Sequence, residues 1–156
     1  MKNNALFRFV LPAIIIMGGG FILFNVAFIL FALVVNLTIS IFGTDPHSAP
    51  PVLSRLLGFL AIGGLTWIGF KINLKSDEIK HTLRATLITM PLMALLIALG
   101  IMLYEQAQWM VLLAGALIIV PSLYYVWRLK LSWKYLFAII YVAVLALYVM
   151  WSGMDI

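Results

Sequence analysis

The chain has 156 residues, of which 65% are hydrophobic and 10% charged, and its formal net charge is +5. Soluble domains are about 45–50% apolar and about 25% charged, and a chain of this length cannot bury so much apolar surface in one core. We therefore expect lipid around most of it, which leaves too little basic surface in water for nucleic-acid binding. The absence of cysteine excludes disulfides, thiol nucleophiles and Cys-ligated metal centres.

Five apolar runs predict an all-α fold, a single membrane domain over residues 1–156 with five transmembrane helices. The runs cover residues 10–42, 52–70, 85–104, 109–127 and 135–151. About 20 residues of helix cross a hydrocarbon core of about 30 Å. Because lipid offers the backbone no hydrogen-bonding partners, each run must satisfy its own N–H and C=O groups as a helix.

The first run is too long for one upright span, because 33 residues form a helix of about 50 Å. Gly18, Gly19 and Gly20 lie near its middle, and each glycine costs a helix about 1 kcal/mol relative to alanine. The sequence favours a break or bend there, with a span over residues 21–42 and with residues 5–17 in the interface or against the bundle. The alternative is one long tilted helix that uses the glycines for close packing.

Glycines and prolines recur in the next three spans. Gly58, Gly63, Gly64 and Gly69 in the second span favour close helix packing over a ligand-binding break. Pro91 in the third span and Pro121 in the fourth each remove a backbone hydrogen bond and predict kinks. Such kinks serve packing in most bundles and gating in some transporters; the sequence favours packing.

The polar residues inside the spans are uncharged. Asn25 and Asn36 are eleven residues apart, which places them on one helix face, and Thr66 and Thr89 lie in the second and third spans. We expect the asparagines to form hydrogen bonds between helices, with contact to a substrate or ion as the alternative. No ionisable residue lies near the middle of a span, which argues against a proton-coupled carrier and against paired catalytic carboxylates.

Basic residues in the connections predict the orientation. With five spans, nine of the ten Lys and Arg residues share one side of the membrane and Arg55 alone lies on the other. Cytoplasmic loops retain Lys and Arg, so we expect a cytoplasmic N-terminus and an external C-terminus, in a prokaryotic cytoplasmic membrane. The basic residues near the inner headgroups are candidates for contact with anionic lipid or a protein partner: Lys71, Lys75, Lys80, Arg84, Arg128, Lys130 and Lys134.

Two histidines lie near acidic residues. His47 and Asp45 could provide two metal ligands, fewer than the three or four that a site needs. His81 follows Asp77 and Glu78 by one helical turn, a spacing that favours a solvated ion-pair network, with a lipid-directed enzyme as a minor hypothesis. Ser76 or Asp77 could cap the third helix. No catalytic, cofactor or metal site is predicted.

The sequence favours a non-enzymatic accessory or regulatory subunit that packs against a membrane protein partner. The absence of catalytic motifs, the short loops and the glycine-rich second span support this prediction. The alternative is a small transporter or channel that assembles as a homo-oligomer. Its path would be lined by polar and kinked positions: Asn25, Asn36, Thr66, Pro91 and Pro121.

Overall fold

The computed structural model describes residues 6–42, 52–103 and 106–152, and these form helices and no strand. A π-helical turn at Leu6–Val10 leads into α1 (Leu11–Phe42). The other four helices are α2 (Val52–Lys71), α3 (Asp77–Met102), α4 (Gln108–Arg128) and α5 (Trp133–Trp151). All five are long and apolar enough to cross a membrane. The predicted all-α bundle with five helices capable of spanning a membrane is confirmed.

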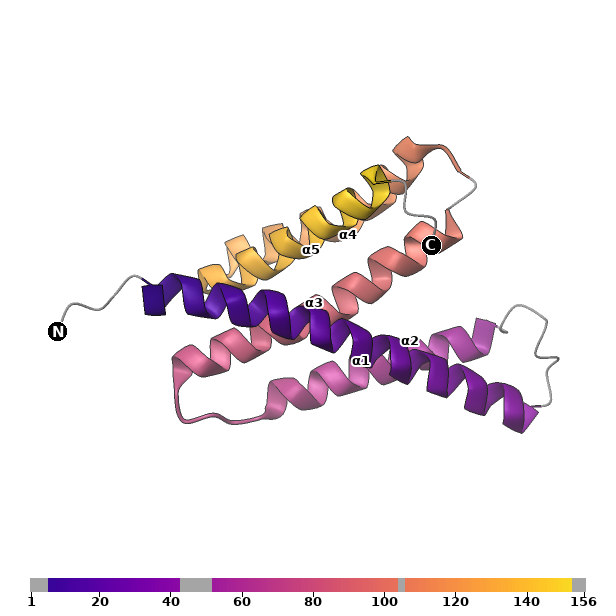
Figure 1. The fold of residues 1–156 in the computed structure, drawn as a ribbon, viewed down its shortest axis with the longest axis horizontal. Coiled ribbons are helices and arrows are strands. Elements are labelled where there is room, and N and C mark those ends of the chain that lie inside the picture. The colour runs from indigo at the N-terminus through magenta and orange to yellow at the C-terminus, as the bar shows by residue number, and fades with distance from the viewer. Residues whose placement is uncertain (1–5, 43–51, 104–105, 153–156) are drawn as a thin grey trace.

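Successive helices run in opposite directions. Figure 1 shows that α1, α3 and α5 begin at the end of the bundle where α2 and α4 finish. Lys71, Arg128 and Lys134 lie at these helix ends, so we call this end of the bundle the basic end. Its placement on the cytoplasmic side stays a prediction from the positive-inside rule.

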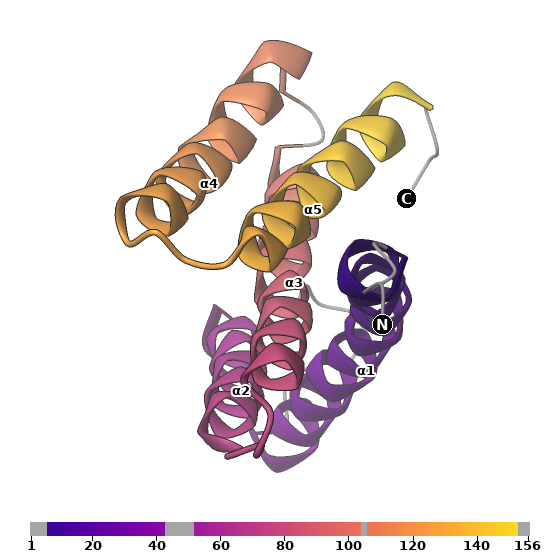
Figure 2. The ribbon, with the colours of Figure 1, turned by 90° about the vertical axis from the view of Figure 1, so that its left-hand side faces the viewer.

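Helix α3 is the centre of the fold. It packs against each of the other four helices, whereas α2 packs only on α1 and α3, and α4 only on α5 and α3. Viewed end-on, α3 lies between an α1–α2 layer and an α4–α5 layer (Figure 2). Its buried face includes Met90, which packs with Ala27 and Ile62, and Met93, which packs with Ile16 and Ile139.

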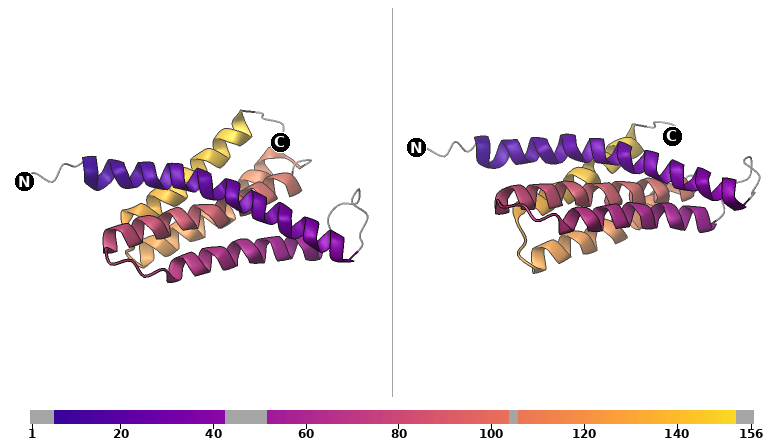
Figure 3. Two further views of the ribbon diagram at one scale, coloured as in Figure 1. Left: turned by 60° about the horizontal axis from the view of Figure 1, so that its bottom comes forward. Right: turned by 90° about the horizontal axis from the view of Figure 1, so that it is seen from below.

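The first helix corrects one expectation, because α1 runs without a break through Gly18–Gly20. The helix has no break there, and the alternative of one long helix is confirmed; Ile16, in the segment expected in the interface or against the bundle, is completely buried. A Cβ added at Gly19 or Gly20 would lie 2.8 Å from a side-chain atom of Thr86 or Thr89 of α3. The glycines thus let α1 cross closely over α3 (Figure 3), and this packing offsets their poor helix propensity.

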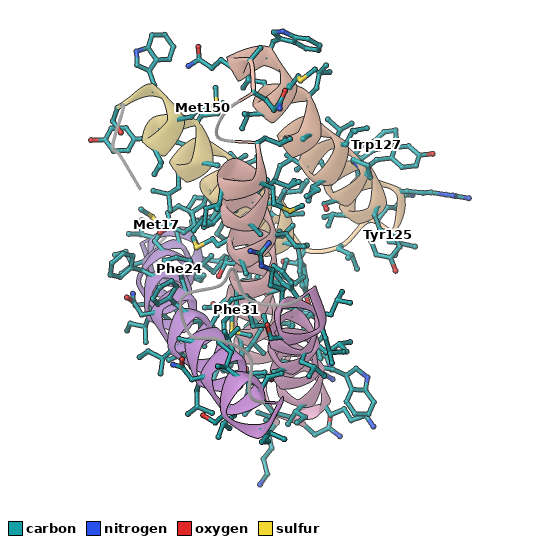
Figure 4. All side chains as sticks on the ribbon, turned by 90° about the vertical axis from the view of Figure 1, so that its right-hand side faces the viewer. Met17, Phe24, Phe31, Tyr125, Trp127 and Met150 are labelled. Carbon is teal, nitrogen blue, oxygen red and sulfur yellow. The ribbon has the colours of Figure 1, made fainter. Side chains whose placement is uncertain are left out.

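The other glycine and proline positions also lie within continuous helices. In α2, a Cβ at Gly58 would overlap the ring of Phe31, and one at Gly69 would lie 2.6 Å from Leu87. In Figure 4 Phe31 lies between α1 and α2. Helices α3 and α4 continue through Pro91 and Pro121. The third helix begins at Asp77 rather than at residue 85, because its first two turns are polar and escape a search for apolar runs.

The turn from α4 to α5 is closed by two backbone hydrogen bonds. The N–H of Leu131 donates to the Val126 carbonyl and that of Lys130 to the Trp127 carbonyl. This pairing is a Schellman motif, with Lys130 at the position that requires a left-handed backbone; its φ is 48°. Val126 and Leu131 both pack into the core beside this turn.

We expect Lys130→Gly to stabilise the protein, because glycine adopts positive φ without the cost that a Cβ imposes, roughly 1 kcal/mol. Thermal unfolding in detergent measures the change. Lys130→Gln removes the same charge without relieving the backbone and is the control. Equal melting temperatures for the two variants would contradict this explanation.

Candidate functional site

The basic end of the bundle holds a buried lysine. Lys134, the second residue of α5, is only 5% exposed. Its Nζ donates to the Oγ1 of Thr82 and to the backbone carbonyl of Glu78, both at 2.8 Å. The Thr82 hydroxyl in turn donates to the same Glu78 carbonyl. These bonds attach the start of α5 to the first turns of α3.

A second set of contacts lies beside this lysine. The Nδ1 of His81 is 3.2 Å from the hydroxyl of Tyr135, and the two rings meet edge to face. Arg84 donates from Nη2 to the Phe70 carbonyl at 2.8 Å and lies over the Phe70 ring. Arg84 therefore binds one of the last carbonyls of α2. Sequence reasoning missed these pairs because their partners lie far apart in the chain.

A cavity of about 420 Å³ opens at this end. Its lining comes from the segment before α1, from α3 and from the start of α5: Arg8, Phe9, Asp77, Glu78, His81, Ser132, Trp133 and Lys134. Within residues 6–42, 52–103 and 106–152, no three His, Asp or Glu side chains converge as a metal site would need. Asp45 and His47 lie outside the described residues. Ser76 occupies the N-cap of α3 without a side-chain capping bond.

The basic residues that the sequence grouped together fall into two sets. Lys134 and Arg84 face inward and donate to protein groups. The Nζ of Lys71 lies 3.8 Å from the centre of the Trp67 ring, and Lys75, Arg128 and Lys130 are exposed, with Lys80 half-buried. Tyr125 and Trp127 also project outward from the basic end of α4 (Figure 4). Contact of these outward-facing cations with anionic lipid stays a prediction.

The second candidate region is the outer face of α1. Asn25 and Asn36 are both exposed, and at 100° per residue they point about 160–180° away from Ala27, which is buried. The Nδ2 of Asn25 donates to the Phe21 carbonyl of its own helix at 2.8 Å. No other described residue bonds to the Asn36 side chain. The expected bonds from these asparagines to another helix are therefore absent among the described residues.

The remaining predicted polar positions bond locally. Thr66 donates to the Ile62 carbonyl one turn earlier, and Thr89, fully buried against Gly20, donates to the Thr86 carbonyl. Pro91 is half-buried and Pro121 exposed. These side chains do not gather around one space. A contact that sequence reasoning missed joins the hydroxyl of Tyr141 in α5 to the Met17 carbonyl in α1.

No protein-family model, curated protein or solved structure matches this chain.

Proposed function

We propose that the protein is a non-enzymatic integral membrane component, an accessory or regulatory subunit that packs the outer face of α1 against a transmembrane helix of a partner. The observation that supports this proposal is the exposed position of Asn25 near the midpoint of α1 (Leu11–Phe42). At this depth the neighbouring molecules are acyl chains, and α1 carries no charged residue.

The physical argument concerns the amide of Asn25. One of its N–H groups is bonded to Phe21, which leaves the second N–H and the carbonyl oxygen of an exposed side chain without a partner among the described residues. A polar group without a partner in an apolar medium costs several kcal/mol. An asparagine on a partner helix would satisfy it, for a gain of about 0.6–2 kcal/mol.

The outward-facing cations of the basic end fit the same proposal. Lys71, Lys75, Lys80, Arg128 and Lys130 would lie at the headgroups of the inner leaflet of a cytoplasmic membrane, where anionic lipid or an acidic partner segment attracts them. A prokaryotic membrane remains our expectation. The subunit role is favoured over an oligomeric transporter because Thr66, Thr89 and Pro121 face different surroundings and line no common path.

Photo-cross-linking in native membranes tests the proposal. A photoreactive side chain at Ile29, beside Asn25 on the outer face of α1 and 65% exposed, should form a protein adduct. The matched control is Leu117 on α4, which is 75% exposed and should label lipid alone. Lipid labelling at both positions would refute the proposal.

A further inference from the structure

The outer face of α1 has the spacing of a coiled-coil seam. Five positions follow one another at intervals of three or four residues: Ile22, Asn25, Ile29, Ala32 and Asn36. This alternation is the heptad pattern that lets two helices supercoil with a small crossing angle. Four of these five positions are exposed, with Ile22 at 64% and Ile29 at 65%, and Ala32 is half-buried.

This inference rests on the packing proposed above for the outer face of α1: we infer that the helix on that face is α1 of a second copy of this chain, in a parallel dimer whose two-fold axis runs along the membrane normal, so that the accessory subunit is itself a dimer. All copies insert with the same orientation, since the same loop charges direct each one. A two-fold axis of this kind places every residue opposite itself at the same depth. Asn25 therefore meets Asn25 of the second copy, and Asn36 meets Asn36.

The chemistry of asparagine suits this self-pairing. A side-chain amide carries both donors and an acceptor, so two identical amides at one depth satisfy each other. A different partner would have to place polar groups at two depths, three helical turns apart. Two asparagine pairs also fix the register, because sliding one helix would leave amides facing apolar side chains.

The opposite face of α1 is already occupied. Ile16, Ala27 and Val35 are buried against the bundle, so α1 has a single free face. An interface that uses one face of each copy closes as a dimer instead of growing into a chain. No seam position carries a charge that would repel its own copy.

Disulfide cross-linking tests the inference directly, because the chain contains no cysteine. Ile29→Cys and Ile22→Cys should each form a covalent species of twice the 17.4 kDa chain mass in oxidised native membranes. A disulfide needs Cα atoms about 4.4–6.8 Å apart, a distance found only along the seam. Phe28→Cys is the matched control, since Phe28 is equally exposed at 66% but points about 80° from the seam; it should stay monomeric.

A second variant tests the asparagines. In the Ile29→Cys chain, the double substitution Asn25→Leu and Asn36→Leu should weaken dimerisation by tenfold or more. The measurement is the loss of cross-linking as the membranes are diluted with added lipid. Asn25→Gln with Asn36→Gln should retain it. Equal cross-linking at positions 28 and 29 would overturn the inference. An Ile29→Cys adduct with a different protein would overturn the inference and leave the proposed function intact. Photolabelling of lipid alone at position 29 would contradict both the inference and the proposed function.

Discussion

Gly20→Ala should destabilise the bundle, whereas Gly18→Ala, two residues away in the same triplet, should not. A Cβ at Gly20 would lie 2.8 Å from the Oγ1 of Thr89, while one at Gly18 meets nothing within 4 Å. Thr89 cannot move aside cheaply, because it is fully buried and its hydroxyl is bonded to the Thr86 carbonyl. We expect a loss of about 1–3 kcal/mol at Gly20 from overpacking and a gain of up to about 1 kcal/mol at Gly18 from helix propensity.

Unfolding by a denaturing detergent, followed for each single variant, measures both changes. Both substitutions bring the same gain in propensity, so their difference isolates the contact between α1 and α3. Thr89→Ala removes the oxygen that the new Cβ would meet, and the double variant should recover about 1 kcal/mol of the loss. Equal stabilities for the two glycine variants would mean that α1 does not approach α3 this closely.

The sequence could predict the five spans but not the continuous course of the first helix, and the glycines of α1 show why. Lipid forces long apolar segments into helices, so the five spans follow from composition. Helix propensity counts only the cost of a glycine within its own helix. The compensating contacts of Gly19 and Gly20 with Thr86 and Thr89 come from α3, more than 60 residues later in the chain. Such a gain has no local signature.

The two candidate regions also differ in how far the sequence alone could predict them. The shared face of Asn25 and Asn36 follows from the helical period, a local property, so the sequence could predict it. The partners of Lys134 could not be predicted. A lysine at the start of a span is expected to extend to the headgroups, and nothing near it in the sequence indicates Thr82, 52 residues earlier. Only the packing of α5 on α3 brings the two together.

Thr82→Val should destabilise the protein by about 1.5–3 kcal/mol, because it removes an acceptor of the buried Lys134 ammonium group. Valine keeps the shape of threonine but removes the acceptor that receives the Lys134 Nζ at 2.8 Å. The ammonium group is then left with the Glu78 carbonyl as its remaining acceptor among the described residues. Hydrogen bonds to charged groups are worth about 1.5–3 kcal/mol, and a buried donor without its partner loses that much.

Two further variants separate this bond from other effects of the substitution. Thr66→Val also removes a hydroxyl that bonds one turn back in its own helix, but no lysine of the described segments is bonded to Thr66, so its cost should stay within about 0.5 kcal/mol. In a Lys134→Met background, Thr82→Val should cost equally little, because the ammonium group that needs the hydroxyl is gone. A full loss that persists in that background would show that Thr82 stabilises α3 alone. A loss confined to the chain with Lys134 would show that the lysine joins α5 to α3 through this hydroxyl.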